Sequence, residues 1–216
     1  MDAPDMRQWI DVCIEAAQAE MVGDLTPEVL TMPGMTCAIV RSFLHHLTGH
    51  PKLNRYAEVG AHMGATACAA GSATDCHVSV CDNFSQFQMV DFAIPGPRDP
   101  HRTTVNVEDV CRGNLDKYLG DRCTLYTGDS VEWDIGPQDV LFYDGDHSED
   151  ATYANLVELV PRSNCRVLIV DDFAGDGVAA GTIAALTGMA ARGDWQPASV
   201  WHRSWWNGVL IAVRAG

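Results

Sequence analysis

Basic residues are scarce in this chain, and their scarcity excludes several kinds of partner. Only 14 of its 216 residues are lysine or arginine, against 29 aspartates and glutamates, so the formal net charge is −15. A surface this acidic repels phosphate backbones and anionic lipid headgroups. We therefore expect that neither nucleic acid nor a membrane surface is a partner of this protein.

Long apolar runs and paired cysteines are also missing. No apolar run reaches the roughly 18 residues that a membrane-spanning helix needs, and the N-terminus lacks the basic and then apolar pattern of a secretory signal. The eight cysteines include no C-x-x-C pair, and most fall in expected helices or strands, where a thiol behaves as a small apolar group. We therefore expect no zinc site or disulfide framework, and a cytoplasmic location.

Two hydrophobic periodicities alternate along most of the chain. Apolar segments of strand length are expected at 53–59, 76–81, 122–127, 139–143 and 166–170. Helical spacing is found between them, at 107–119, 148–160 and 178–191. The last two apolar segments, 198–203 and 208–213, favour strands that are joined by a tight turn.

This order predicts an α/β fold with a doubly wound, mostly parallel, seven-stranded sheet that ends in an antiparallel hairpin. We expect a single domain over 1–216, with the α/β core at 51–216. Helices expected at 6–22 and between Met35 and Leu47 would form an N-terminal helical cap, 1–50. These helices could close a ligand cleft, form the face of a homodimer or only cover the core.

The segment 83–106 has the composition of a loop, because it contains Pro95, Gly96, Pro97 and Pro100. A structureless connection of this length is uncommon inside a compact domain, and it is usually either functional or disordered. Since it follows an expected strand end, we interpret it as a lid over a substrate. The alternative is a surface loop without a role.

A glycine turn is the strongest local motif. The segment 56–66, YAEVGAHMGAT, predicts a strand, a tight turn at Gly60 and Gly64, and the start of a helix. Glycines there allow backbone to turn sharply and to approach a ligand closely. Asp82 ends the next expected strand, at the place where an acidic residue would bind the ribose of a nucleoside.

The turn differs from the dinucleotide fingerprint G-x-G-x-x-G, because Glu58 occupies the position of the first glycine. A carboxylate there would repel a pyrophosphate, but it would suit a ligand that carries positive charge. An NAD-dependent oxidoreductase is therefore disfavoured. A non-catalytic nucleoside-binding module, or a turn that binds nothing, remains as an alternative.

Acidic residues follow most of the expected parallel strands: Glu58, Asp82, Asp129, Asp144 and the pair Asp171–Asp172. In a doubly wound sheet these ends share one edge, where ligands bind. The carboxylates after the fourth and fifth strands would converge, since neighbouring strands lie about 4.8 Å apart. Hard oxygen ligands favour Mg²⁺. The alternative is that some of these aspartates only cap helices or accept backbone N–H bonds.

The order E-x-G-x-x-x-G-x-T, then D-G-D-H, then D-D resembles class I S-adenosylmethionine (SAM)-dependent methyltransferases with a Rossmann-like fold. Within this class it is similar to the metal-dependent O-methyltransferases of the macrocin and mycinamicin sugar type and the catechol and caffeoyl-CoA type. The resemblance covers about residues 53–173. The Asp-Asp pair is nearer to the sugar type, since the catechol type has Asp-Asn.

The resemblance implies a site for SAM and for Mg²⁺. The metal ligands it implies are Asp144, Asp171 and Asp172. The residues expected to contact the cofactor are Glu58, Gly60, Ala61, His62, Gly64, Thr66, Asp82, Asn83, Asp129, Ser130 and Asp144.

His147 stands three residues after Asp144, where the catechol type carries a lysine base. An imidazole with a pKa of about 6.5 can accept a proton at neutral pH, so we expect His147, with Asp144, to be catalytic. The alternative for His147 is an ion pair with Asp144 or Glu149 at the start of a helix. The expected acceptor is a small hydroxylated molecule, such as a sugar, glycoside or catechol. A metal-independent methyltransferase that acts on an amine remains the alternative reaction.

Overall fold

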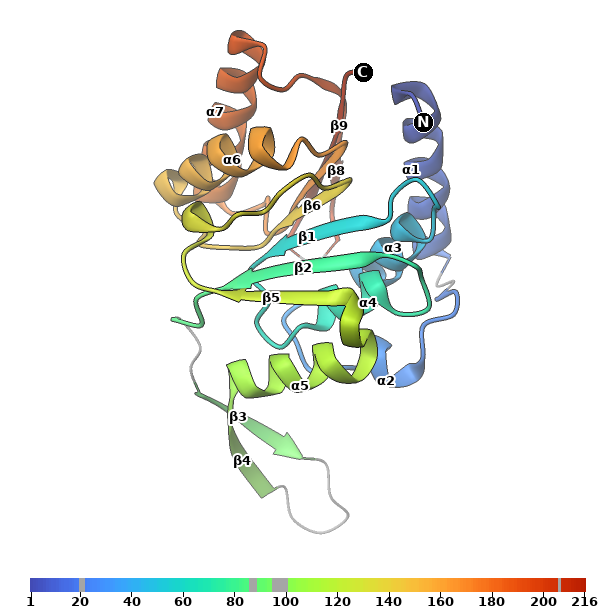
Figure 1. The fold of residues 1–216 in the computed structure, drawn as a ribbon, viewed down its shortest axis with the longest axis vertical. Coiled ribbons are helices and arrows are strands. Elements are labelled where there is room, and N and C mark those ends of the chain that lie inside the picture. The colour runs from blue at the N-terminus through green and yellow to red at the C-terminus, as the bar shows by residue number, and fades with distance from the viewer. Residues whose placement is uncertain (20–21, 86–88, 95–100, 206) are drawn as a thin grey trace.

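A seven-stranded sheet forms the centre of the molecule (Figure 1). The computed structural model describes residues 1–19, 22–85, 89–94, 101–205 and 207–216. The strand order is β5-β2-β1-β6-β7-β9-β8. The parallel strands are β1 (Arg55–Val59), β2 (His77–Asp82), β5 (Cys123–Thr127), β6 (Val140–Tyr143) and β7 (Val167–Val170). Every residue of β6 and β7 is buried, as expected for central parallel strands.

The sheet ends in the antiparallel hairpin that the sequence predicted. β9 (Val209–Arg214) pairs antiparallel with both β7 and β8 (Pro197–Arg203). The order of the parallel strands reverses at β1, which has β2 on one side and β6 on the other. In such sheets ligands bind outside the carboxyl ends of the strands, next to this reversal. The predicted fold class is confirmed.

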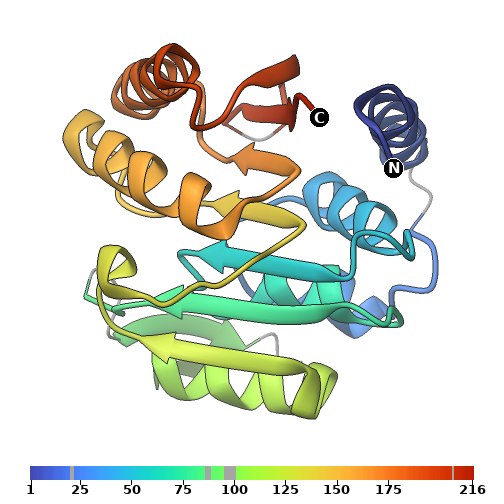
Figure 2. The ribbon, with the colours of Figure 1, turned by 45° about the horizontal axis from the view of Figure 1, so that its top comes forward.

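Helices cover both faces of the sheet (Figure 2). One apolar cluster joins Tyr56 of β1 to α1 (Ala3–Gln18), α3 (Ala38–Thr48), α4 (Ala65–Gly71) and α5 (Val107–Leu119). A second cluster joins Ala57 and Val59 to α6 (Glu149–Ser163) and α7 (Asp176–Arg192). Neighbouring residues of β1 therefore point to opposite faces, as the two-residue period of a strand requires. None of the described helices is both long and apolar enough to cross a membrane.

The N-terminal helices differ in detail from the prediction. The first helix begins before residue 6, because Asp2 caps it by accepting a hydrogen bond from the Asp5 N–H at 3.0 Å. It ends at Gln18, before residue 22. A short helix that was not predicted, α2 (Pro27–Leu30), begins after Thr26, whose hydroxyl accepts from the Val29 N–H. The helix α6 does not stop at Pro161, which lies inside its last turn. It continues to Ser163, and its C-cap residue Asn164 has a left-handed φ of 52°.

The segment 83–106 is not structureless, and this corrects the sequence-based expectation. β3 (Met89–Ile94) and β4 (His101–Asn106) form an antiparallel pair, which in Figure 1 projects past α5 and away from the central sheet. The prolines and the glycine that suggested a loop all fall at 95–100, outside the described residues. The role of this segment as a lid stays a prediction.

Candidate functional site

A cavity of about 420 Å³ opens at the carboxyl ends of β1, β2, β5 and β6. The predicted site residues in its wall are Gly60, His62, Asp82, Asn83, Asp129, Ser130, Asp144 and His147. Glu58, Ala61, Gly64, Thr66, Asp171 and Asp172 do not line this cavity. The wall also contains residues that sequence reasoning missed, among them Met35, Phe84 and Asn155.

The glycine turn holds the ends of β1 and β6 in direct contact. Gly60 has a φ of +90°, and a Cβ added to it would lie 1.8 Å from the carbonyl oxygen of Asp144. Its N–H donates to the carbonyl oxygen of Cys81 at 2.9 Å, which ties the turn to β2. Glycine is therefore required at this position both for its backbone conformation and for space.

Asp82 connects the two loops on either side of the cavity. Its Oδ2 accepts a hydrogen bond from the His62 N–H at 2.8 Å, and its Oδ1 accepts from the Phe84 N–H at 2.6 Å. Each carboxylate oxygen can accept a further hydrogen bond. Asp82 can therefore bind a ligand hydroxyl while it fixes both loops.

Glu58 lies behind the glycine turn, in the core. Its carboxyl group is fully buried and accepts hydrogen bonds from the hydroxyls of Tyr56 at 2.5 Å and Thr66 at 2.6 Å. Burial raises the pKa of Glu58 to about 8. Glu58 and Thr66 thus join β1 to α4, and they do not present charge to the cavity.

The turn after β5 and the helix α6 form another part of the wall. Asp129 accepts from the Val131 N–H at 3.1 Å, and the Ser130 hydroxyl donates to Oδ1 of Asn155 on α6. Asn155 is 9% exposed, and its Nδ2 donates to the Ala151 carbonyl oxygen at 2.9 Å. No local sequence pattern marked Asn155, which lies on the buried face of α6 in the folded chain.

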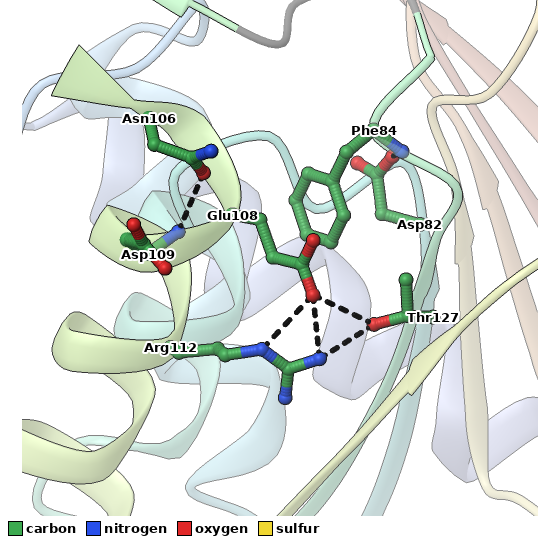
Figure 3. A network of polar contacts seen from close by, with 7 residues as sticks. All are labelled: Asp82, Phe84, Asn106, Glu108, Asp109, Arg112 and Thr127. Carbon is green, nitrogen blue, oxygen red and sulfur yellow. Dashed lines mark hydrogen bonds and ion pairs between the residues drawn. The ribbon is translucent and has the colours of Figure 1, made fainter.

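Side chains of α5 reach the end of β5 (Figure 3). Arg112 Nη2 donates to Oε1 of Glu108 at 2.6 Å and to the Thr127 hydroxyl at 2.7 Å, and Asn106 caps α5 by accepting from the Asp109 N–H. Arg112 and Glu108 are partly exposed, so their ion pair contributes little to stability. The network nevertheless orients the start of α5, where Val107 lines the cavity.

Two carboxylates and an imidazole meet at the ends of β6 and β7. Nε2 of His147 lies 3.6 Å from Oδ1 of Asp144 and 3.2 Å from Oδ2 of Asp172. One ligand atom from each of the three residues lies within 4.8 Å of the other two. Asp171 is not part of this group. It is buried, and its Oδ1 accepts a hydrogen bond from the Asp172 N–H at 3.0 Å.

The electrostatics of this group favour a cation. Burial, together with the neighbouring carboxylates, raises the pKa of Asp144 to about 6 and that of Asp171 to about 7. The hydrogen bond to Asp144 and the charges of both carboxylates raise the pKa of His147 above 6.5. Oδ1 of Asp172 is buried and has no hydrogen-bond partner among the described residues, and Asp172 has a left-handed φ of 51°. The residues present therefore fit a divalent cation between Asp144 and Asp172.

Comparisons with known proteins support the fold. Neither a family model nor a curated protein matches this sequence. Among solved structures, the SAH-bound methyltransferase PaMTH1 of Podospora anserina matches with a TM-score of 0.55 and 15% identity, over 96% of this chain and 88% of that one. SAH is S-adenosylhomocysteine, the demethylated form of SAM.

Two further solved structures also match the fold of this chain. The O-methyltransferase from Bacillus cereus in complex with SAH has a TM-score of 0.54 and 13% identity, over 95% of this chain and 90% of that one. The O-methyltransferase TomG from Streptomyces achromogenes, involved in tomaymycin synthesis and in complex with SAM, has a TM-score of 0.57 and 13% identity, over 96% and 89%. This chain has the Rossmann-like fold of these methyltransferases.

Proposed function

We propose that this protein is a SAM-dependent O-methyltransferase. The observation that carries the proposal is that Asp82, at the end of β2, lines the same cavity as Asp144 and His147, which follow β6. The cavity thus contains a hydrogen-bond acceptor for the ribose hydroxyls. Beside it are carboxylates and an imidazole that can act on the molecule that receives the methyl group. The fold similarity to SAM- and SAH-bound methyltransferases supports this reading.

The charge of the cavity suits SAM better than a phosphate-bearing nucleotide. Asp82, Asp129, Asp144 and Asp146 all belong to its wall. SAM carries positive charge on its sulfonium and ammonium groups and has no phosphate. In a partly buried site, carboxylates attract such charges more strongly than they do in bulk water. Asp82 would accept from the ribose hydroxyls, and Ser130 with Asn155 would hold the base.

Asp144 and Asp172 would hold Mg²⁺, and Asp171 would support them by accepting from the Asp172 N–H. A bound Mg²⁺ would lower the pKa of an acceptor hydroxyl and orient it. The imidazole of His147 borders the cavity and would accept the proton that this hydroxyl loses. The acceptor in this proposal is a small hydroxylated molecule.

A specific contact favours a second candidate, a metal-independent methyltransferase that acts on an amine. A protonated His147, placed 3.2 Å from Asp172 and 3.6 Å from Asp144, would itself neutralise part of their charge without a metal ion. In that case the two aspartates would orient an amine acceptor. The two candidates use the same cofactor cavity and differ in the requirement for a metal.

A methyl-transfer assay separates the two candidates. Labelled SAM is incubated with hydroxylated and amine acceptors, in the presence of Mg²⁺ or of EDTA. We expect label in a hydroxylated acceptor, loss of transfer in EDTA, and recovery when Mg²⁺ is restored. Transfer to an amine that EDTA leaves unchanged would support the second candidate. A chain that binds neither SAM nor SAH would contradict both.

A further inference from the structure

Arg41 on α3 is a buried cation whose described hydrogen bonds go to backbone carbonyl oxygens. Arg41 is only 3% exposed. Nη1 donates to the carbonyl oxygens of Val29 at 3.3 Å, Leu30 at 3.0 Å and Met32 at 2.6 Å, and Nη2 donates to that of Thr36 at 3.4 Å. One guanidinium thus connects the end of α2 to the residues just before α3.

Two of the contacted carbonyl oxygens, those of Val29 and Leu30, belong to the last residues of α2. α2 has four residues, and the last carbonyls of any helix have no partner within that helix. They also carry the negative end of the helix dipole, which a cation stabilises. An arginine suits this role because its planar guanidinium presents several N–H donors in a fixed geometry and stays charged. Arg41 therefore fixes the path of the segment 29–36.

This segment supplies part of the cavity wall. Met35 is 51% exposed and lines the cavity, whereas Met32 is 5% exposed and packs in the core. Between them, Gly34 lies against the first residue of α4: a Cβ added to it would be 2.9 Å from Cβ of Ala65 and 3.1 Å from Nη2 of Arg41. The segment 29–36 thus packs between α4 and the guanidinium of Arg41, with Met35 on the side of the cavity.

We propose that Arg41 is a positioning residue for ligand binding, because it fixes the segment 29–36 so that Met35 closes the cavity wall. Arg41 is absent from the cavity wall, so it acts through the segment and not on the ligand. The inference rests on the proposed function, since its main readout is the binding of SAH. It assigns to the N-terminal region a role in the site beyond covering the core.

The test replaces Arg41 by lysine, which keeps the charge but cannot reach four carbonyl oxygens in one geometry. We expect Arg41→Lys to weaken SAH binding about tenfold in calorimetry. We expect the KM for SAM to rise while kcat changes less, because the chemical groups stay in place. Amide hydrogen exchange in the segment 29–36 should become faster.

The chain offers a matched control in Arg122. Its Nη1 donates to the carbonyl oxygens of Gly71 at 2.7 Å, Thr74 at 2.7 Å and Cys76 at 3.1 Å, at the end of α4 that is remote from the cavity. Arg122→Lys removes the same kind of contact, so it should lower stability but leave SAH affinity unchanged. Met35→Ala should weaken SAH binding without a loss of stability, because Met35 is half exposed.

The outcomes are distinct. Unchanged SAH affinity in Arg41→Lys, or an equal loss in Arg41→Lys and Arg122→Lys, would overturn the positioning role. If Arg41→Lys does not fold, Met35→Ala provides the test. Unchanged SAH affinity in Met35→Ala would overturn the positioning role as well. An unmodified chain that binds no SAH would instead remove the proposed function, and this inference with it.

Discussion

Nε2 of His147 lies 3.2 Å from Oδ2 of Asp172, although the two residues belong to turns that follow different strands. The contact exists because β6 and β7 are neighbouring parallel strands, so their carboxyl ends bring the two turns together. Asp144 completes the group, with its Oδ1 at 3.6 Å from the same nitrogen. The first two predictions concern this group.

Replacing Asp172 by asparagine should weaken metal binding. The change removes one of the two carboxylates of this group, and it leaves the size of the side chain nearly unchanged. We expect the affinity for Mn²⁺, used as a spectroscopic substitute for Mg²⁺, to fall by about tenfold or more. Electron paramagnetic resonance of free Mn²⁺ measures this. Asp150→Asn, at an exposed position on α6, is the control, and equal affinities in the two variants would contradict the site.

Replacing His147 by glutamine should reduce turnover without weakening the binding of the cofactor. A base that accepts a proton in the transition state contributes about 100-fold or more to the rate. We expect kcat to fall by this amount while the dissociation constant of SAH is unchanged. His77→Gln, exposed at the start of β2, serves as the control in the same rate and calorimetric assays. Full activity of His147→Gln would mean that another group is the base.

A comparison of two glycine variants tests the contact between the ends of β1 and β6. Both Gly60 and Gly136 have positive φ, but an added Cβ meets the Asp144 carbonyl at 1.8 Å in the first case and nothing within 4 Å in the second. Gly136→Ala should cost about 1 kcal/mol through backbone strain alone. Gly60→Ala should cost more than about 3 kcal/mol, because the two strand ends must separate. Urea unfolding measures both values, and similar losses would refute the contact.

The burial of Glu58 predicts a dependence of stability on pH. Its pKa is about 8 in the folded chain, against 4.5 for a glutamate in water, so the folded state holds a proton that the unfolded state releases. The stability that this group contributes is complete below about pH 4.5 and is lost as the pH rises toward about 8. Glu58→Gln should therefore gain stability relative to the unmodified chain across this window, by at most about 1.4 kcal/mol per pH unit.

Urea unfolding at several pH values between 5 and 8.5 measures this difference. The control is Glu158→Gln, at an exposed position on α6, which should follow the unmodified chain at every pH. A difference between Glu58→Gln and the unmodified chain that does not change with pH would show that Glu58 is charged throughout this range.

The sheet could be predicted from the sequence because its signals are local. The central strands β6 and β7 are continuous apolar segments, and each is followed by aspartate at the same edge. The hairpin of β3 and β4 could not, because the prolines and glycine at 95–100 dominate the composition of that segment. Asn155 and Met35 reach the cavity only through tertiary packing, which no local pattern records.

The site shows where position in the sequence is a poor guide to the direction of a side chain. The motif suggested that Glu58 faces the ligand, but β1 turns Tyr56 and Glu58 toward α4 and leaves Val59 at the cavity. The two-residue period of a strand contains this information. Asp172 lies beside Asp144 and His147, with Asp171 behind it, and this position depends on the left-handed backbone conformation of Asp172. No sequence pattern predicts that conformation.

The most direct test of the account is a calorimetric titration of SAH into the unmodified chain, Asp82→Asn and Asp75→Asn. Asp82 binds two backbone N–H groups and faces the cavity, whereas Asp75 is exposed in the turn between α4 and β2. We predict a micromolar dissociation constant for the unmodified chain and for Asp75→Asn, and binding that is about tenfold weaker or worse for Asp82→Asn. No binding by the unmodified chain, or unchanged affinity in Asp82→Asn, would contradict the account.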